Sequence, residues 1–269
     1  MPELPEVETV RRSLEPIVGQ RIEGVEVREP RLRQRIGDDF APALTGRTIT
    51  AIERRGKYLL FRLSGGRCLL AHLGMSGALL LQPHGVPSRP HDHVRLRLSG
   101  GRQLTFNDPR RFGLLRVGAD SEFAELRNVG PDPSSNAVSL EQLVRLARGR
   151  KRPVKTLLMD QRALGGIGNI YANEILFRAG IRPGRQSRRL TRRQLAALLR
   201  AIRSVLRSAV RLGGSSISDY RDSDGRPGYF QLHLRVYDRA GRPCARCQTP
   251  IRRMVHAGRS SFYCPRCQK

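Results

Sequence analysis

Apolar residues change their spacing along the chain, and the change separates a strand-rich part from a helix-rich part. Val7, Val10 and Leu14 recur at helical spacing, and short apolar runs then follow one another through residues 21–118. The runs that we expect to be strands are 48–52, 58–63, 68–73, 78–81, 94–98, 103–106 and 114–117. This succession predicts one helix followed by a β-sandwich.

Two turns of nearly identical sequence support the sandwich. Leu63-Ser64-Gly65-Gly66-Arg67 and Leu98-Ser99-Gly100-Gly101-Arg102 each join two apolar runs. Two copies do not indicate a solenoid, so we interpret them as similar hairpins of one sandwich. Cys68 stands alone in one of the runs and is expected to be an ordinary core residue.

Helical signals dominate after residues 128–136, which are rich in Gly, Pro and Ser and mark a domain boundary. Ser139 with Gln142, and Thr191 with Gln194, have the spacing of a capping box. The second box opens an amphipathic helix that ends at Gly213-Gly214. The chain is therefore expected to be an α+β protein.

A glycine-rich turn, residues 165–168, lies between the helical segment 154–158 and a helix that starts at Asn169. Backbone N–H groups at such a start would suit a DNA phosphate, although a structural elbow without a ligand has the same pattern. The polar stretch 215–229 is expected to be a lid or binding loop, or else disordered.

The net charge of +27 indicates a polyanionic partner, most simply nucleic acid. Residues 175–218 hold eleven arginines and no carboxylate, and no carboxylate follows Asp238. Only four of the 50 basic residues are lysines, namely Lys57, Lys151, Lys155 and Lys269. Since arginine does not deprotonate, Lys57 is a candidate for proton chemistry, whereas chance retention is the alternative for any one lysine.

Four of the five cysteines lie in the last 26 residues, as Cys244, Cys247, Cys264 and Cys267. Two Cys-X-X-Cys pairs separated by sixteen residues have the spacing of a structural zinc site, and a redox dithiol would need only one pair. The segment 251–263 between the pairs is expected to be a hairpin that presents Arg252, Arg253 and Arg259. Clustered cysteines, no apolar run of membrane-spanning length and no signal peptide together predict a cytoplasmic protein.

The first ten residues hold three carboxylates and no basic side chain. Removal of Met1 would leave Pro2 with a free secondary amine, whose reference pKa of about 8 leaves a useful neutral fraction at pH 7. Such an amine can attack an aldehyde-level carbon to give an iminium, while Glu3 and Glu6 hold or donate protons. The alternative is an ordinary capped helix with a frayed end. No phosphate-loop or dinucleotide fingerprint is present, so we expect no nucleotide cofactor.

These features occur together in one family. The terminal Pro-Glu-Leu-Pro-Glu, Gly56-Lys57-Tyr58, the segments 72–77 and 108–113, the glycine turn and the four cysteines resemble formamidopyrimidine-DNA glycosylases, from Pro2 to Lys269. Members are bacterial base-excision enzymes for oxidised purines. The resemblance implies a β-sandwich catalytic domain at 1–130, a helix-two-turn-helix DNA-binding domain at 131–232 and a C-terminal zinc finger with one Zn²⁺ at 233–269.

The resemblance also implies roles for single residues. Pro2 would attack C1′ of the damaged nucleotide with Glu3 donating a proton, Lys57 would act in β-elimination and Arg259 in δ-elimination. Residues expected to fill the space left by the flipped base are Met75, Arg110 and Phe112. Residues expected to contact DNA are His91, Arg110, Lys151, Arg152, Lys155, Asn169 and Arg259. The loop 216–229 corresponds to the lesion-capping loop of the family.

Some alternatives stay open on the sequence. Met75 and Phe112 have the periodicity of core residues, and His91 with Asp92 and His93 could suggest a metal, although phosphate contact or ordinary hydrogen bonding is preferred. An endonuclease VIII-type enzyme for oxidised pyrimidines is disfavoured by Leu4, where that branch has glycine. A non-catalytic zinc-containing DNA-binding protein would explain the charge but not the acidic, proline-led start. The expected partner is duplex DNA with oxidised bases or abasic sites, bound by a monomer.

Overall fold

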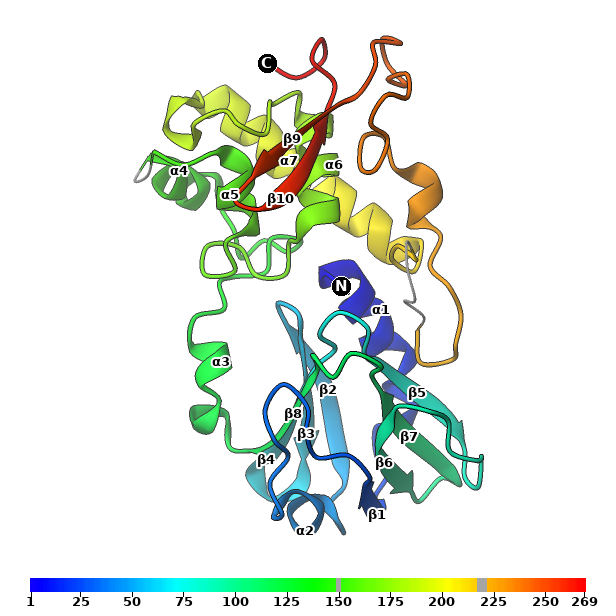
Figure 1. The fold of residues 1–269 in the computed structure, drawn as a ribbon. Coiled ribbons are helices and arrows are strands. Elements are labelled where there is room, and N and C mark those ends of the chain that lie inside the picture. Colours follow the sequence, from blue (N-terminus) through cyan, green and yellow to red (C-terminus); the bar gives the residue numbers. More distant parts are fainter. Residues whose placement is uncertain (149–150, 217–221) are drawn as a thin grey trace. The chain divides into compact units, whose positions relative to one another are not determined.

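The computed structural model describes residues 1–148, 151–216 and 222–269 (Figure 1). Its contacts divide the chain into two compact units. The first unit contains Met1–Arg127 and Leu212–Tyr229, and the second contains Asn128–Arg211 and Phe230–Lys269. No helix in the described ranges is long and apolar enough to cross a membrane.

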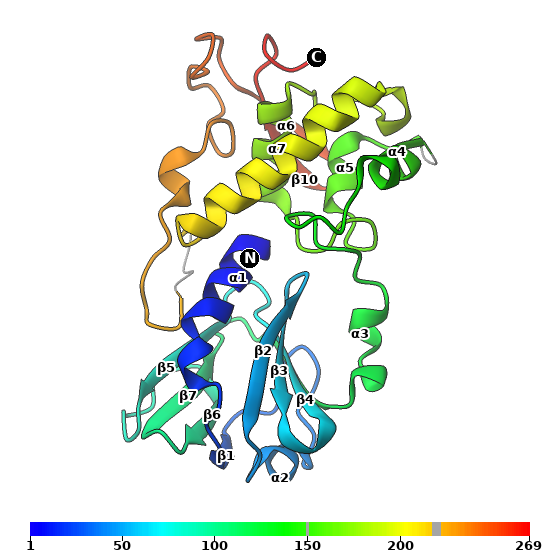
Figure 2. The ribbon, with the colours of Figure 1, turned by 180° about the vertical axis from the view of Figure 1, so that it is seen from behind.

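The first unit is a β-sandwich with the helix α1 (Leu4–Ser13) beside it (Figure 2). Its two four-stranded sheets have the orders β2-β3-β4-β8 and β1-β6-β7-β5, with every pair antiparallel. The strands are β1 Ile22–Val27, β2 Ile49–Arg55, β3 Tyr58–Leu63, β4 Arg67–His72, β5 Ala78–Pro83, β6 Asp92–Leu98, β7 Arg102–Asn107 and β8 Leu114–Gly118. Buried residues from both sheets and from α1 form one apolar core, as the period-two pattern requires.

Both expected hairpins are confirmed. β3 and β4 pair through Leu63↔Arg67, and β6 and β7 pair through Leu98↔Arg102. Cys68 is 1% exposed, and burial raises the pKa of its thiol to about 12, as expected of a core residue. Strand β1 was not among the expected strands, because Gly24, two glutamates and a register shift between Ile22 and Gly24 interrupt its apolar alternation.

The second unit combines helices with the hairpin β9 (Arg252–His256) and β10 (Arg259–Tyr263). Its helices are α4 Leu140–Arg148, α5 Val154–Met159, α6 Asn169–Ala179 and α7 Arg192–Arg211. Both capping boxes are confirmed: Gln142 N–H donates to Ser139 Oγ at 3.1 Å, and Gln194 N–H donates to Thr191 Oγ1 at 3.2 Å. The remaining short helices of the chain are α2 Phe40–Leu44, α3 Ala124–Arg127, η1 Glu15–Ile17, η2 Ser64–Gly66, η3 Asp120–Glu122, η4 Ser187–Arg189 and η5 Phe230–His233.

Buried polar side chains fasten the terminal segment to these helices. Asn173 Oδ1 accepts the Phe262 N–H at 2.7 Å, and the Glu174 carboxylate accepts the N–H groups of Arg235, Val236 and Tyr237 at 2.9–3.0 Å. Both side chains are at most 4% exposed. The cost of burying them is therefore offset by hydrogen bonds that fix where the hairpin lies on α6.

The two units differ in detail from the domain division expected from the sequence. Residues of the expected helical domain and zinc finger share one unit, while Leu212–Tyr229 packs with the sandwich. Ser215 N–H donates to Glu6 Oε1 at 2.7 Å, and Leu81 N–H donates to the Ser223 carbonyl at 2.9 Å. These bonds tie the segment after α7 to α1 and β5. The boundaries at 130 and 232 stay a prediction.

Candidate active site and nucleic-acid interface

Pro2 and Glu3 are buried at the start of α1. Glu3 is the N-cap, and its carboxylate accepts the backbone N–H of Glu6. In return, Glu6 Oε2 accepts the Glu3 N–H at 2.8 Å, which completes a capping box. The capped helix is confirmed, whereas the alternative of a frayed end does not apply to Glu3, because the Glu3 and Glu6 carboxylates both hold this turn.

The environment of the terminus favours a neutral amine. Burial lowers the pKa of the Met1 terminal amine below 8.0; Glu3 and Glu6 oppose the shift, while Lys57 and Arg110 add to it. All four side chains therefore act on one nitrogen. An amine in this position is more nucleophilic at neutral pH than one on an open surface.

Lys57 reaches this region from the tight turn between β2 and β3. Gly56 supplies the positive φ of 60° that the turn needs, and Lys57 itself is only 7% exposed. His72, at the end of β4, faces Tyr58 with ring centroids 4.8 Å apart. Burial, then the positive charges of Lys57 and Arg33, lower the pKa of His72 to about 4, so this ring is neutral at pH 7.

Asp108 organises the two loops that connect the sheets at this end of the sandwich. Its carboxylate accepts the Ser76 hydroxyl at 2.6 Å and the Gly113 N–H at 2.8 Å. Gly74 has a φ of 62°, and a Cβ there would lie 2.5 Å from the Phe112 carbonyl carbon. Only glycine therefore allows the loop 73–77 to lie against the loop 108–113.

These loops leave large side chains in solvent. Met75 is 42% exposed and Phe112 is 45% exposed, so the alternative that they are core residues is wrong. The Arg110 guanidinium lies 4.8 Å from the centre of the Phe112 ring, a cation–π contact. An exposed apolar pair with an arginine is typical of a binding surface.

The expected DNA contacts in the second unit differ in exposure. Lys151 is exposed, Arg152 pairs with Asp160 at 2.8 Å, and Asn169 is the first residue of α6. Lys155 is 1% exposed, and its Nζ donates to the Ser260 carbonyl at 2.7 Å and to Ser261 Oγ at 2.9 Å. This burial argues against the expected direct contact of Lys155 with a phosphate.

Arg259 is exposed at the beginning of β10, one residue after Ala257-Gly258, both of which have positive φ. Lys155 therefore holds the strand directly beside Arg259.

His91 is also exposed and has a left-handed backbone conformation, with φ 69°. His93 is buried, and its Nε2 lies 2.7 Å from the Asp108 carbonyl oxygen. Neither histidine belongs to a cluster of metal ligands in the part of the chain that the structure describes.

The four cysteines of the expected zinc site come together. Their Sγ atoms all lie within 4.8 Å of one another, with 3.4 Å between Cys247 and Cys264 and 4.0 Å between Cys244 and Cys267. Zn–S bonds of about 2.3 Å give tetrahedral S–S separations of about 3.8 Å, so these thiols fit one Zn²⁺. Backbone N–H groups of Arg246 and Cys267 also point at Cys244 and Cys264 sulfurs, at 3.4 Å each.

Residues 217–221 of the expected lesion-capping loop fall outside the described residues.

The sequence did not single out two residues that the structure places in this region, His72 and Asp108. Both stand inside quoted motifs, but their importance depends on a strand pairing and on a contact between loops that sequence spacing does not show.

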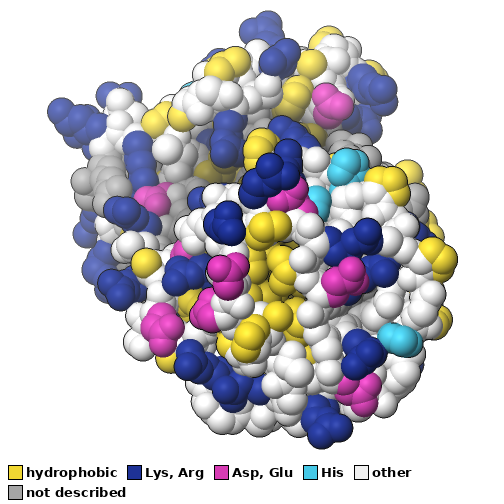
Figure 3. Space-filling model, turned by 60° about the horizontal axis from the view of Figure 1, so that its bottom comes forward, with side chains coloured by type: hydrophobic (Ala, Val, Ile, Leu, Met, Phe, Trp, Pro, Cys, Tyr) yellow, Lys and Arg dark blue, Asp and Glu magenta, His cyan; other side chains and the backbone are white. Residues whose placement is uncertain are grey.

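Basic side chains also spread widely over the surface. In Figure 3, Lys and Arg surround a central group of hydrophobic side chains, with acidic side chains interspersed. The net charge of +27 over the chain suits a polyanion, whose phosphates contact many cations at once.

Comparison with known proteins gives one consistent result. Residues 1–115 match the formamidopyrimidine-DNA glycosylase N-terminal domain, 129–221 match the H2TH domain of the same enzyme, and 241–269 match the zinc finger found in FPG and IleRS. Formamidopyrimidine-DNA glycosylases of Syntrophotalea carbinolica and Thiobacillus denitrificans are 47% and 49% identical, each over 100% of both chains.

Solved structures agree. The MutM (FPG) protein of Thermus thermophilus has a TM-score of 0.88 at 46% identity, covering 99% of this chain and 98% of that one. The FPG (MutM) of Lactococcus lactis, in complex with DNA containing FAPY-dG, has a TM-score of 0.91 at 35% identity, covering 99% and 100%. The Lactococcus protein has also been solved with DNA containing an abasic site, with the same TM-score of 0.91.

Replacing Gly74 by alanine tests the contact between the two loops. We expect Gly74→Ala to cost about 2–4 kcal/mol of unfolding free energy, from positive φ and from the clash with the Phe112 backbone. Gly101→Ala is the matched control, because its φ is 69° and no atom lies within 4 Å of an added Cβ. It should cost only about 1 kcal/mol. Equal losses in urea unfolding of the two variants would contradict the proposed close packing.

The lowered pKa of His72 predicts a pH dependence of stability. A base whose pKa falls from 6.5 to about 4 on folding binds fewer protons in the folded state, so stability is lost as pH falls through this window. The loss attributable to His72 would reach about 3 kcal/mol. His72 Nδ1 accepts the Gly74 N–H at 3.0 Å, and the side-chain oxygen of His72→Asn can replace this acceptor. In this variant, unfolding should depend less on pH between 7 and 4. The exposed His84→Asn control should behave like the unchanged protein.

Proposed function

Because this chain belongs to the formamidopyrimidine-DNA glycosylase family, we propose that it excises oxidised purines from duplex DNA and then cleaves the abasic site with its own lyase activity. The observation that supports this most is the chain start, where Pro2 and Glu3 are buried and Glu3, Glu6, Lys57 and Arg110 all act on the Met1 amine that precedes Pro2. A protein that only binds DNA has no need to desolvate its terminal nitrogen. Relatives have been solved with the two kinds of DNA that such an enzyme would meet.

The first chemical step would belong to Pro2. With Met1 removed, its neutral secondary amine would attack C1′ of the damaged nucleotide, and the C1′–N bond to the base would break. Glu3, which caps the same helix turn, would donate a proton toward the opening sugar. The product is an iminium between the Pro2 nitrogen and C1′, with the oxidised purine released.

Elimination would follow from the iminium. Its electron demand acidifies the proton on C2′, whose loss breaks the C3′–O bond, and Lys57 is the residue that we assign to this β-elimination. Lys57 is 7% exposed, and its charge acts on the amine at the chain start, so it lies in the region where the iminium would form. Arg259 would act in the subsequent δ-elimination, which would leave a gap with a phosphate on each side.

Base extrusion would depend on the exposed side chains of the two sheet-connecting loops. Met75, Arg110 and Phe112 would fill the space that the flipped nucleotide leaves, since apolar wedges and an arginine lower the cost of that void. His91 and Asn169 would contact phosphates, joined by Lys151 and Arg152. We assign Lys155 a positioning role, because it holds the strand that carries Arg259.

The Zn²⁺ would be held by Cys244, Cys247, Cys264 and Cys267 and would supply structural rigidity rather than reactivity. The buried core around it contains only a few apolar side chains, among them Phe177, Val236, Ile251 and Phe262. A core this small needs a metal to stabilise it.

We also propose that the protein acts in the cytoplasm as a monomer.

Borohydride trapping tests the proposed chemistry. On duplex DNA containing 8-oxoguanine, borohydride should reduce the iminium and leave a covalent adduct whose crosslinked peptide begins at Pro2. The trapping rate should rise with pH to a plateau, because only the deprotonated secondary amine of Pro2 can attack C1′.

A one-residue extension before Pro2 should abolish trapping, while the same residue added after Lys269 should not. Full trapping by a protein that retains Met1 would refute Pro2 as the nucleophile.

Zinc removal tests the role of the terminal hairpin. Chelation should weaken binding to abasic-site DNA by at least tenfold, because the hairpin and Arg259 lose their support. Thermal unfolding of the sandwich unit should be unchanged. Affinity that survives complete metal removal would show that the hairpin is not part of the binding surface.

A further inference from the structure

A cavity of about 430 Å³ lies within the second unit, and neither Asn169 nor Arg259 is among the residues that line it. It is bounded by α6, α7, η5 and the loop that carries Cys244 and Cys247. The polar groups that line it include three guanidinium groups and two hydroxyls, from Arg178, Arg235, Arg246, Ser204 and Ser208.

The charge of this cavity is strongly positive. Among the described residues, none of the three arginines forms an ion pair with a carboxylate. The one carboxylate in the lining, Glu174, is 4% exposed and accepts three backbone N–H groups, and burial raises its pKa. Arg235 opposes this shift, so Glu174 interacts with one of the three arginines, and Arg178 and Arg246 leave the cavity positively charged.

Part of the donor set is held in place before any ligand arrives. The Arg246 guanidinium lies 4.4 Å from the centre of the Phe177 ring and donates to the Phe177 carbonyl at 3.3 Å. The Glu174 carboxylate fixes the backbone of Arg235 at 3.0 Å. Ser204 and Ser208 are one turn apart on α7 and thus share a face. Arg246 and the two serines are therefore positioned before binding, whereas Arg178 and Arg235 are exposed and would be ordered by the ligand.

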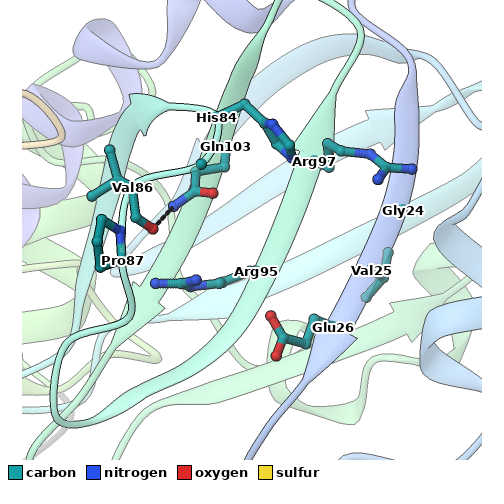
Figure 4. A pocket seen from close by; sticks show the side chains of 10 residues that line it. Gly24, Val25, Glu26, His84, Val86, Pro87, Arg95, Arg97 and Gln103 are labelled. Carbon is teal, nitrogen blue, oxygen red and sulfur yellow. Dashed lines mark hydrogen bonds between the residues drawn. The ribbon is translucent and has the colours of Figure 1, made fainter.

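A cavity of the first unit shows the contrast. It measures about 480 Å³ on the outer face of the sheet β1-β6-β7-β5, where Arg95, Arg97, His84 and Glu26 line it (Figure 4). There Arg95 pairs with Asp92 at 3.1 Å, and Arg97 lies 3.7 Å from the Glu23 carboxylate. Balanced charge gives that cavity no preference for an anion.

We propose that the cavity between α6, α7 and the first cysteine pair binds a phosphate group carried by a nucleotide-sized ligand. Guanidinium groups and hydroxyls are the side chains that recognise phosphate oxygens. His233, which also lines the cavity and is exposed, offers a ring on which a base can stack. The volume falls in the range of small-ligand sites.

Calorimetric titration of the full-length, zinc-loaded protein with dAMP tests this proposal without reference to glycosylase activity. We expect saturable binding at one site, weakened at least tenfold in Arg178→Ala/Arg235→Ala. The matched control, Arg189→Ala/Arg193→Ala, removes two exposed arginines outside the cavity and should bind as before. Equal weakening in both pairs, or no saturable binding, would overturn the proposal.

Two additions keep the test decisive. If the arginine variant does not fold, Ser204→Ala/Ser208→Ala should still weaken dAMP binding, and unchanged binding would count against the site. A trinucleotide with a 5′ phosphate identifies the source of the phosphate. Tighter binding of the trinucleotide assigns the cavity to a DNA strand end, and tighter binding of dAMP assigns it to a free nucleotide.

Discussion

The Glu6 carboxylate is the interaction on which the proposed chemistry depends. One oxygen accepts the Glu3 N–H and the other accepts the Ser215 N–H, so the chain start and a segment two hundred residues later share one anchor. Gly214 must be glycine here, since its φ is 79° and a Cβ would lie 2.9 Å from Glu6 Oε1. A nucleophile at a chain terminus has few covalent restraints, and the two hydrogen bonds of Glu6 supply the positional restraint that a chain end lacks.

The exposed apolar side chains follow from how the sheets are connected. The chain passes from one sheet to the other between β4 and β5 and returns between β7 and β8. The two connections meet through Ser76 and Asp108, which projects Met75 and Phe112 outward. Periodicity cannot reveal this, because large apolar residues beside strands usually continue the core. The connection between two sheets is a tertiary feature, so the exposure of its residues can be predicted only when the contact between both connections is known.

Local chemistry was predictable wherever a few neighbouring residues determine the outcome. Spacings of a few residues determine strand β3, both capping boxes and the hairpin turns. The cysteine cluster depends on such spacings and on the binding of a single metal. Burial of Lys155 was not predictable, because its acceptors Ser260 and Ser261 lie more than a hundred residues away. His72 likewise owes its lowered pKa mainly to burial by the fold rather than to its neighbours in sequence.

The rarity of lysine has a structural explanation as well as a chemical one. Of the four lysines, Lys57 and Lys155 are buried and Lys151 and Lys269 are exposed. A buried guanidinium would need acceptors for five N–H groups, whereas an ammonium needs acceptors for three. At Lys155 a carbonyl and a hydroxyl supply two of them, so arginine would leave more donors unsatisfied there. Lysine at 155 is thus explained by packing.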